Sequence, residues 1–333
     1  MNLSKFFYFS CLFVSFISCN EINDEKLVTN SGETQGTFYY IKYINQSGDD
    51  LHSDIDSLLL LVDNSLSTYS KNSLLSNINY NKEFIVDSLI KEVFLKSKEI
   101  YLETNGFFDC SVAPLVNAWG FGFSQKEKMD SIKVSQLLNI IGFDKVNLKN
   151  DSIIKPNKML LDFNSIAQGY TVDLVAKMLE SKGVNNYLVE IGGELRSKGK
   201  SPSNKLWTIG VDKPIKEIDS QDRFQFILEL ANKSLATSGN YRKFFIDDGI
   251  KYSHIINPKT GFPAKNRLLS VTVIHDNCMD ADAYATAFMV MGLKKSKDFI
   301  SKKQDLEAYF VYSNMEGELE SFITDNFEKR IVD

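Results

Sequence analysis

Apolar residues recur at helical spacing early in the chain. One stripe has members four, three and four positions apart: Leu51, Ile55, Leu58 and Val62. Residues at this spacing lie on one face of a helix, so a helix is predicted here. A second helix is expected over residues 90–101, with Asp87 or Ser88 capping its start.

Two further helices are predicted in the second half of the chain. The first covers residues 167–181 and the second covers residues 281–291. Gly183 follows the first and Gly292 follows the second. Glycine directly after the last apolar residue is a common helix stop.

Short runs rich in β-branched and aromatic residues fill much of the remaining sequence. Thr37–Tyr43 is the first predicted strand. Others are expected at residues 187–191, 207–211, 224–230, 252–256, 269–275 and 308–312. These elements do not alternate regularly as strand and helix. The pattern favours an α+β fold, with mixed sheets and packed helices, over a doubly wound Rossmann sheet.

The N-terminus has a different character, and residues 1–18 are interpreted as a lipoprotein signal peptide. The apolar run over residues 6–17 is too short to cross a hydrocarbon core of about 30 Å as a helix. Ser18 and Cys19 follow it, and a small residue directly before cysteine resembles a bacterial lipobox. Cys19 is therefore the predicted lipidation site; an ordinary cleaved signal with a chance cysteine is the alternative.

The predicted signal sets the expected organisation and location. Residues 19–35 are polar and rich in turn formers, so a flexible tether is expected there. Residues 36–333 would form one domain. The expected location is the bacterial cell membrane, with a lipid anchor and the domain facing the periplasm.

Composition narrows the class of partner. With 38 basic and 43 acidic residues the net charge is −5, so there is no general basic excess of the kind that binds nucleic acid. Cys110 and Cys278 remain beyond the N-terminal segment, in no zinc-binding pattern. Two such cysteines do not make a disulfide framework and are expected to be buried.

Two positions carry a weak signal for chemistry. Asp282 and Thr286 are four residues apart on a predicted helix, so their side chains share one side of it. A carboxylate and a hydroxyl are oxygen ligands of the kind that Mg²⁺ accepts. Helix capping would explain the same pair. His254, at the end of a predicted strand, is a candidate for acid–base chemistry or an ordinary structural histidine.

Four longer stretches combine glycines, polar residues and aromatic residues. They cover residues 66–70, residues 105–122, residues 162–170 with 190–194, and residues 236–286 in part. Their aromatic side chains could stack on a flat ring system or belong to the core. Gly192 and Gly193 could cradle a phosphate or form a tight turn, and they match neither a Rossmann nor a P-loop motif.

Taken together, these stretches resemble the FAD:protein FMN transferase (ApbE) family. The motifs occur in the family's order: Gly36-Thr37, Leu66-Ser67-Thr68-Tyr69, Phe108-Asp109, Pro114 to Asn117, Trp119 to Gly122, Asp162 to Tyr170, Gly192-Gly193, Ala236 to Gly239, Ser253 to Ile256, Pro258 with Thr260-Gly261, and Ala281 to Ala283 with Thr286. Each motif is short, but the ordered set is specific. The resemblance implies an α+β, T-fold-related architecture with two lobes.

The resemblance also implies roles for individual residues. FAD, as substrate, would contact Gln35, Tyr69, Phe107, Phe108, Asp109, Asp162, Gln168 and Ile256. Mg²⁺ would be held by Ser165, Asp282 and Thr286, and His254 would handle the proton. The sequence departs from the family pattern at Gln35, where methionine is common, and at Gln168, where lysine or glutamate is common.

The expected activity is transfer of the FMN part of FAD to a threonine or serine hydroxyl of a target protein, with release of AMP. Target proteins would belong to membrane electron-transport complexes. Two alternatives share the same site: an FAD pyrophosphatase that uses water as the acceptor, and a flavin-binding lipoprotein without catalysis.

Overall fold

A computed structural model describes residues 26–45, 47–213, 223–240, 244–247 and 250–332. Its centre is an eight-stranded sheet in which every neighbouring pair is antiparallel. In sheet order the strands are β1 (Lys26–Thr34), β2 (Thr37–Asn45), β5 (Asn186–Ile191), β6 (Glu194–Lys198), β9 (Ser234–Gly239), β12 (Leu268–His275), β13 (Glu307–Ser313) and β14 (Leu319–Ile323). The predicted α+β class is confirmed, and the sheet has none of the parallel pairing of a Rossmann fold.

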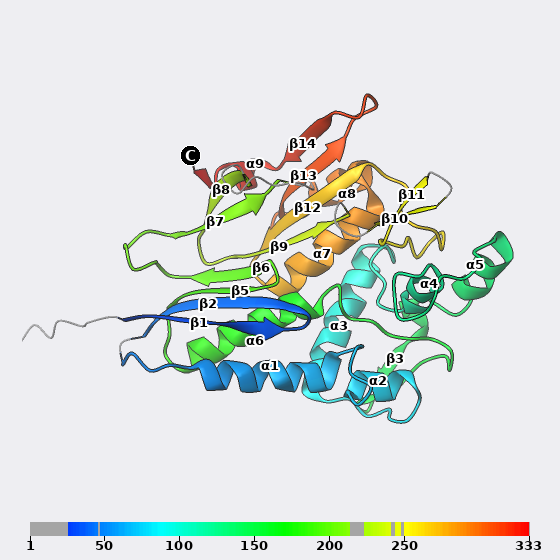
Figure 1. Ribbon diagram of the computed structural model, residues 1–333, viewed down its shortest axis with the longest axis horizontal. Helices are drawn as coiled ribbons and strands as arrows, with labels where there is room; N and C mark the ends of the chain where they lie inside the picture. Colours follow the sequence, from blue (N-terminus) through cyan, green and yellow to red (C-terminus); the bar gives the residue numbers. More distant parts are fainter. Residues whose placement is uncertain (1–25, 46, 214–222, 241–243, 248–249, 333) are drawn as a thin grey trace, which may run out of the picture.

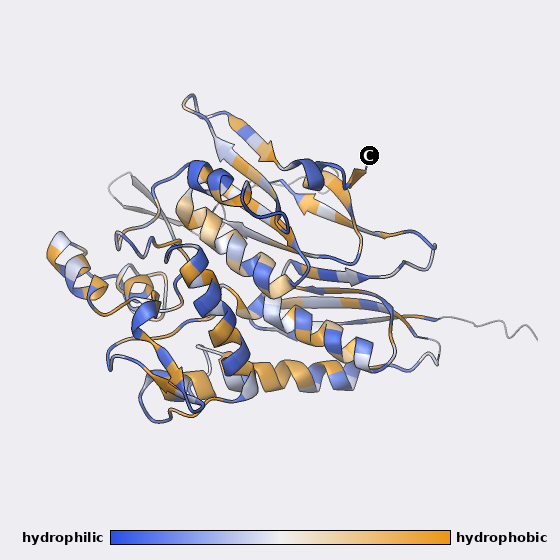
Figure 2. Cartoon of the chain, turned by 180° about the vertical axis from the view of Figure 1, so that it is seen from behind, coloured by the Kyte–Doolittle hydropathy of each residue, from blue (hydrophilic) through white to orange (hydrophobic). Residues whose placement is uncertain are grey.

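Helices cover one face of this sheet (Figures 1 and 2). They are α1 (His52–Leu66), α3 (Ser88–Glu103), α6 (Ala167–Ser181), α7 (Cys278–Met291) and α8 (Leu293–Ile300). Successive side chains of a strand point to opposite faces of the sheet, so every second one points into the helical layer. Tyr39, Ile41 and Tyr43 of β2 are fully buried there.

The other face of the sheet is covered at its C-terminal end by a smaller sheet, in the order β15 (Ile331–Val332), β8 (Phe224–Leu230) and β7 (Trp207–Asp212), and by α9 (Asp325–Glu328). Figure 1 shows this layer near the C-terminus. Leu195, Leu235 and Ile274 of the main sheet pack against Leu228 and Leu230 in a second core. The main sheet is therefore buried on both faces at this end.

The remaining elements lie beside α3, at the right of Figure 1. They are α2 (Leu74–Asn79), α4 (Ala113–Ala118), α5 (Ser131–Leu138), a 3₁₀ turn (Phe143–Lys145), the hairpin β3 (Asn147–Lys149) with β4 (Ser152–Ile154), and the hairpin β10 (Phe244–Asp247) with β11 (Ile250–Ser253). Pro114 at the start of α4 and the Asp130 side chain, which accepts a hydrogen bond from Lys133 N, fix the starts of two of these helices.

The predicted helices are present with somewhat different bounds. Residues 167–181 form α6 as expected, with Gly183 at a positive φ of 83° just beyond its end. The Asp87 side chain caps α3 by accepting a hydrogen bond from Ile90 N. The helix expected at residue 281 starts earlier, at Cys278, because Asp173 of α6 supplies the cap for its first backbone N–H groups.

The expectation of a flexible tether over residues 19–35 is wrong from Lys26 onward. Lys26–Thr34 form β1, which pairs with β2 along its whole length. An edge strand needs few apolar residues, and only Asn30 and Thr34 of β1 are buried. The predicted signal peptide and Cys19 lie outside the described residues. In the part of the chain that is described, no helix is long and apolar enough to span a bilayer.

Candidate active site

Hydrogen bonds bring three of the four polar stretches together just before α6. Asn164 donates from Nδ2 to Thr68 Oγ1 at 3.3 Å, which ties the loop before α6 to the end of α1. The backbone N–H of Asp162 donates to the carbonyl of Cys110 at 2.7 Å. Residues almost a hundred positions apart in the sequence are thus neighbours here.

The fourth stretch joins the same region through aromatic residues. Trp119 Nε1 donates to the carbonyl of Gly261 at 2.8 Å, across 142 positions of sequence. The Phe121 ring meets the His254 imidazole edge-on, with 6.4 Å between ring centroids. The Trp119 and Phe262 rings also pack together. The predicted catalytic histidine therefore lies beside the segment predicted to bind the flavin.

The turn between β1 and β2 carries Gln35. Gln35 and Gly36 both have positive φ, 50° and 71°, as a tight hairpin turn requires. The Gln35 side chain donates from Nε2 to Thr171 Oγ1 of α6 at 2.8 Å. A shallow hollow is lined by residues 33–38. Gln35 thus borders a concave surface next to the first turns of α6.

Gln168, in the first turn of α6, contacts the turn between β5 and β6. Its Nε2 donates to the carbonyl of Ile191 at 2.9 Å, and its side chain also bonds to Glu194. Gly192 has a φ of 63°, and a Cβ there would lie 1.7 Å from Gln168 Nε2. The positive φ favours glycine at this position, and a larger residue would also displace the Gln168 side chain.

Helices α6 and α7 touch at Gly169. The Gly169 N–H donates to Asp282 Oδ2 at 3.1 Å. A Cβ on Gly169 would stand 2.4 Å from the carbonyl oxygen of Cys278 and 2.8 Å from Asp282 Cβ. The missing side chain lets the start of α6 come within hydrogen-bond distance of the Asp282 carboxylate.

Two of the three predicted metal ligands, Asp282 and Thr286, are on α7, and the third, Ser165, lies just before α6. Asp282 is 6% exposed, and burial raises the pKa of its carboxyl from 3.8 to about 7. Thr286, one turn later and half-buried, has its hydroxyl 3.2 Å from Ser238 Oγ of β9. Ser165 lies just before α6 and contacts the Cys110 thiol.

A second buried carboxyl group, Glu194, lies beside Asp282. Burial, and then the charge of Asp282, raise the pKa of Glu194 well above its ordinary value. Within the described residues neither of these two carboxyl groups forms an ion pair. The same residues contain no cluster of three or more His, Cys, Asp or Glu side chains placed to hold a metal, so hydroxyl and backbone oxygens would have to complete a site here. Two buried carboxyl groups without a counter-charge, with the Thr286 hydroxyl on the same helix as Asp282, are oxygen groups of the kind that Mg²⁺ accepts.

The aromatic residues predicted to contact FAD have different surroundings. Tyr69 is 73% exposed and packs edge-on against Phe123, with 4.9 Å between centroids. Phe107 is half-buried, with the Lys295 ammonium 4.4 Å from its ring centroid. Phe108 is 1% exposed and belongs to the main core, so its side chain reaches no open surface.

The other predicted contacts are half-buried (Asp109 and Asp162) or buried (Ile256). Asp109 accepts hydrogen bonds from the N–H and hydroxyl of Ser111, while burial raises its pKa. Burial also raises the pKa of Asp162, whose Oδ1 accepts from Asn164 N at 2.8 Å. Ile256 is 5% exposed and packs with Trp119 in a small separate core.

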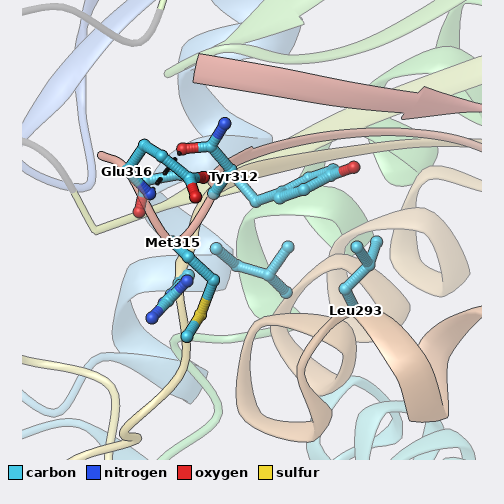
Figure 3. A pocket seen from close by; sticks show the side chains of 8 residues that line it. Leu293, Tyr312, Met315 and Glu316 are labelled. Carbon is cyan, nitrogen blue, oxygen red and sulfur yellow. Dashed lines mark hydrogen bonds between the residues drawn. The ribbon is translucent and has the colours of Figure 1, made fainter. Parts of the chain in front are cut away.

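A separate surface hollow of about 400 Å³ lies at the turn between β13 and β14. Figure 3 shows Leu293 of α8 and Tyr312 on its walls, with Met315 and Glu316 at the turn. None of the predicted site residues lines it. It therefore plays no part in the site described above.

Sequence reasoning missed two groups that shape the site. Glu194 follows the Gly192-Gly193 turn, where strand alternation turns its side chain to the helical face. On the same face, Arg196 forms a 2.5 Å ion pair with Asp173, the residue that caps α7. The sequence did contain a signal for them: Glu194 and Arg196 are charged residues at alternate positions of a short strand, which places both on one face of the sheet.

Solved structures have the same fold. A flavin transferase ApbE from Vibrio cholerae superposes with a TM-score of 0.81 at 35% identity, covering 92% of this chain and 99% of that one. A flavinyl transferase ApbE from Pseudomonas stutzeri in its apo form gives 0.81 at 32% identity, covering 92% and 97%. The architecture is therefore that of the flavin transferases.

Sequence comparison defines the family. The ApbE family model matches residues 35–310. An FAD:protein FMN transferase from Vibrio cholerae is 41% identical over 274 residues, covering 79% of this chain and 80% of the relative. One from Haemophilus influenzae is 33% identical over 320 residues, covering 91% of each. The chain belongs to the ApbE family, and the prediction from its motifs is confirmed.

Proposed function

We propose that this protein is a Mg²⁺-dependent FAD:protein FMN transferase. The observation that carries the proposal is the meeting of the four polar stretches around the start of α6, with Asp282 held there by the Gly169 N–H. The relatives that bear this name match most of the chain. The activity is thus supported by family membership and by the arrangement of the site.

In the proposed reaction the hydroxyl oxygen of a target threonine or serine forms a bond to the FMN-side phosphorus of FAD. The bond from that phosphorus to the bridging oxygen breaks, and AMP leaves with the bridging oxygen. The hydroxyl proton goes to His254, next to Phe121. An unassisted hydroxyl is a weak nucleophile at neutral pH, so a positioned base contributes to the rate.

The chain's own groups would bind and orient FAD and the metal. Ser165, Asp282 and Thr286 would hold Mg²⁺, which supplies positive charge beside the pyrophosphate oxygens. Gly169 fixes the orientation of the Asp282 carboxylate through a 3.1 Å hydrogen bond. Tyr69, with most of its ring exposed, is available to stack on a flat ring of the substrate.

We further propose that Cys19 is lipidated and anchors the protein to the bacterial cell membrane, with the domain facing the periplasm and target proteins in membrane electron-transport complexes. The apolar run over residues 6–17 followed by Ser18 and Cys19 supports this location. In cells, Cys19→Ala should move the protein from the membrane fraction to the soluble fraction. A variant that still sediments with membranes would exclude a lipid anchor at Cys19.

Covalent labelling tests the activity. The protein is incubated with FAD, Mg²⁺ and an acceptor protein carrying a threonine in the family's acceptor motif; the readouts are in-gel flavin fluorescence and released AMP. We expect a fluorescent acceptor band and an equal amount of AMP. Free FMN without a band would identify a pyrophosphatase, and bound FAD that stays intact would identify a binding protein.

Matched variants test the metal ligands in the same assay. Asp282→Ala should remove most of the labelling. Thr286→Val should lower it by about 10-fold or more, because the hydroxyl ligand is lost at nearly constant volume. Thr286→Ser keeps the hydroxyl and is the control, with labelling close to that of the unchanged protein. Equal labelling by Thr286→Val and Thr286→Ser would remove Thr286 from the site.

A further inference from the structure

Glu194 is a buried carboxylate with one unpartnered oxygen. It begins β6 directly after the Gly192-Gly193 turn and is 9% exposed. The Gln168 side chain bonds to it, but Glu194 Oε2 has no hydrogen-bond partner. Leaving a buried polar oxygen without a hydrogen-bond partner is unfavourable, because the desolvation of that atom is not compensated. A bound ligand at this oxygen would supply the missing partner.

Strand β6 also contains a charged residue that has an ion-pair partner, whereas Glu194 has none among the described residues. Arg196, two residues further on the same face, forms a 2.5 Å ion pair with Asp173. Glu194 instead faces Asp282, a carboxylate of the same sign. Within the described residues neither Glu194 nor Asp282 has a cationic partner. Two buried carboxylates side by side are stable together when a cation or a proton lies between them.

A cation explains more of the surroundings than a shared proton does. A proton would satisfy one carboxyl oxygen, but it would leave the Thr286 hydroxyl, one turn after Asp282, without a role at the site. A divalent cation uses carboxylate and hydroxyl oxygens at once. Gly193, an exposed residue of the β5–β6 turn, has nothing within 4 Å of the position of a Cβ, so the turn next to Glu194 is open to solvent.

We propose that Glu194 is a further acidic ligand of the divalent cation held by Asp282 and Thr286, binding it directly or through one bound water. The inference rests on the proposed function for the existence of that cation. It adds a ligand from the sheet to a site otherwise built on α6 and α7. With Glu194 included, the cation would be held between the helical layer and the β5–β6 turn.

The test is direct binding of Mn²⁺, as a spectroscopic substitute for Mg²⁺, to the full chain without FAD. Free Mn²⁺ is measured by electron paramagnetic resonance. Glu194→Gln keeps the shape of the side chain and its bond to Gln168 but removes the charge, and we expect the Mn²⁺ dissociation constant to rise about 10-fold or more. Glu190→Gln is the matched control, because Glu190 is on the neighbouring strand with its side chain on the opposite face of the sheet.

Thermal unfolding gives a second readout that does not depend on activity. In EDTA, Glu194→Gln should leave the melting temperature unchanged or raise it, since it removes a buried carboxyl group that has no cationic partner in the described part of the chain while keeping the shape of the side chain. Saturating Mg²⁺ should then stabilise Glu194→Gln less than the unchanged protein. A residue with only a structural role would lower the melting temperature in both conditions.

The outcomes separate this inference from the proposed function. Weaker Mn²⁺ binding by Glu194→Gln, with Glu190→Gln unchanged, supports the inference. Unchanged binding by Glu194→Gln together with lost binding by Asp282→Asn overturns it and leaves the Asp282 site intact. No Mn²⁺ binding by the unchanged protein overturns both the inference and the proposed metal dependence.

Discussion

Gly169→Ala sets two physical effects of opposite sign against each other. Gly169 is in the first turn of α6, and in a helix alanine is favoured over glycine by up to about 1 kcal/mol through backbone entropy. Against this, the new Cβ would lie 2.4 Å from the carbonyl oxygen of Cys278, while ordinary contacts begin at 3.4 Å. Helix α6 or α7 must therefore move by about 1 Å. Overpacking of this kind costs about 1–3 kcal/mol.

We expect a net loss of about 1–2 kcal/mol in the free energy of unfolding, because the atom that is met is rigid backbone. Urea unfolding followed by circular dichroism measures it. Lys177, an exposed residue of the same helix, provides the reference. The difference between Lys177→Ala and Lys177→Gly measures the preference of α6 for alanine where no packing intervenes.

The same substitution should weaken Mn²⁺ binding, since moving α7 lengthens the 3.1 Å bond from Gly169 N to Asp282 Oδ2. If Gly169→Ala instead stabilised the protein by as much as Lys177→Ala is more stable than Lys177→Gly, the close packing of α6 on α7 would be refuted. Loss of stability with unchanged Mn²⁺ affinity would show that the Asp282 carboxylate does not depend on this contact.

Two further predictions concern buried charge. Asp173→Asn should lower the free energy of unfolding by about 3–5 kcal/mol, measured by urea unfolding, because the half-buried Arg196 loses its 2.5 Å partner and the first N–H groups of α7 lose a charged acceptor. Arg196→Met, which keeps the carboxylate at the start of α7, should cost less, and equal costs would contradict this account of the capping role of Asp173. The folded-state pKa of Asp282 is raised from 3.8 to about 7, so in EDTA the folded protein keeps a proton that the unfolded chain has released over this range. The free energy of unfolding should therefore fall as pH rises from about 4 to about 7, by up to about 1.4 kcal/mol per pH unit from Asp282, and Asp282→Asn should make the slope less steep.

Elements with strong periodicity were predictable from the sequence. Helix α6 and strand β8 were expected with the bounds that the structure has. Strand β1 was missed because an edge strand with a largely polar sequence lacks the alternation that marks a half-buried strand. Strand β9, with the sequence SLATSG, was missed because its residues are mostly small; its first half is buried between α7 on one face and the smaller sheet on the other.

The site was predictable as a set of residues but not as a geometry. The motifs named Asp282 and Thr286, and the resemblance gave them a role. Contacts such as Trp119 with Gly261, 142 positions apart, depend on the folded arrangement and leave no local pattern. The buried position of Phe108 has the same cause, since a run of aromatic residues does not reveal which ring enters the core.

Helix α7 links the stability of the fold to the proposed chemistry. Its start is fixed by Asp173, which accepts hydrogen bonds from the N–H groups of Cys278 and Met279, and its distance from α6 is fixed by Gly169. Asp282 is within this first part of α7, one turn before Thr286, and contacts Gly169 directly. Its carboxylate therefore moves together with the helix. Buried on nearly all sides, α7 transmits a displacement at its start to the carboxylate. Substitutions in α6 that touch no ligand should therefore change metal affinity according to how far they move α7, while equally destabilising substitutions in the β3–β4 hairpin should leave it unchanged.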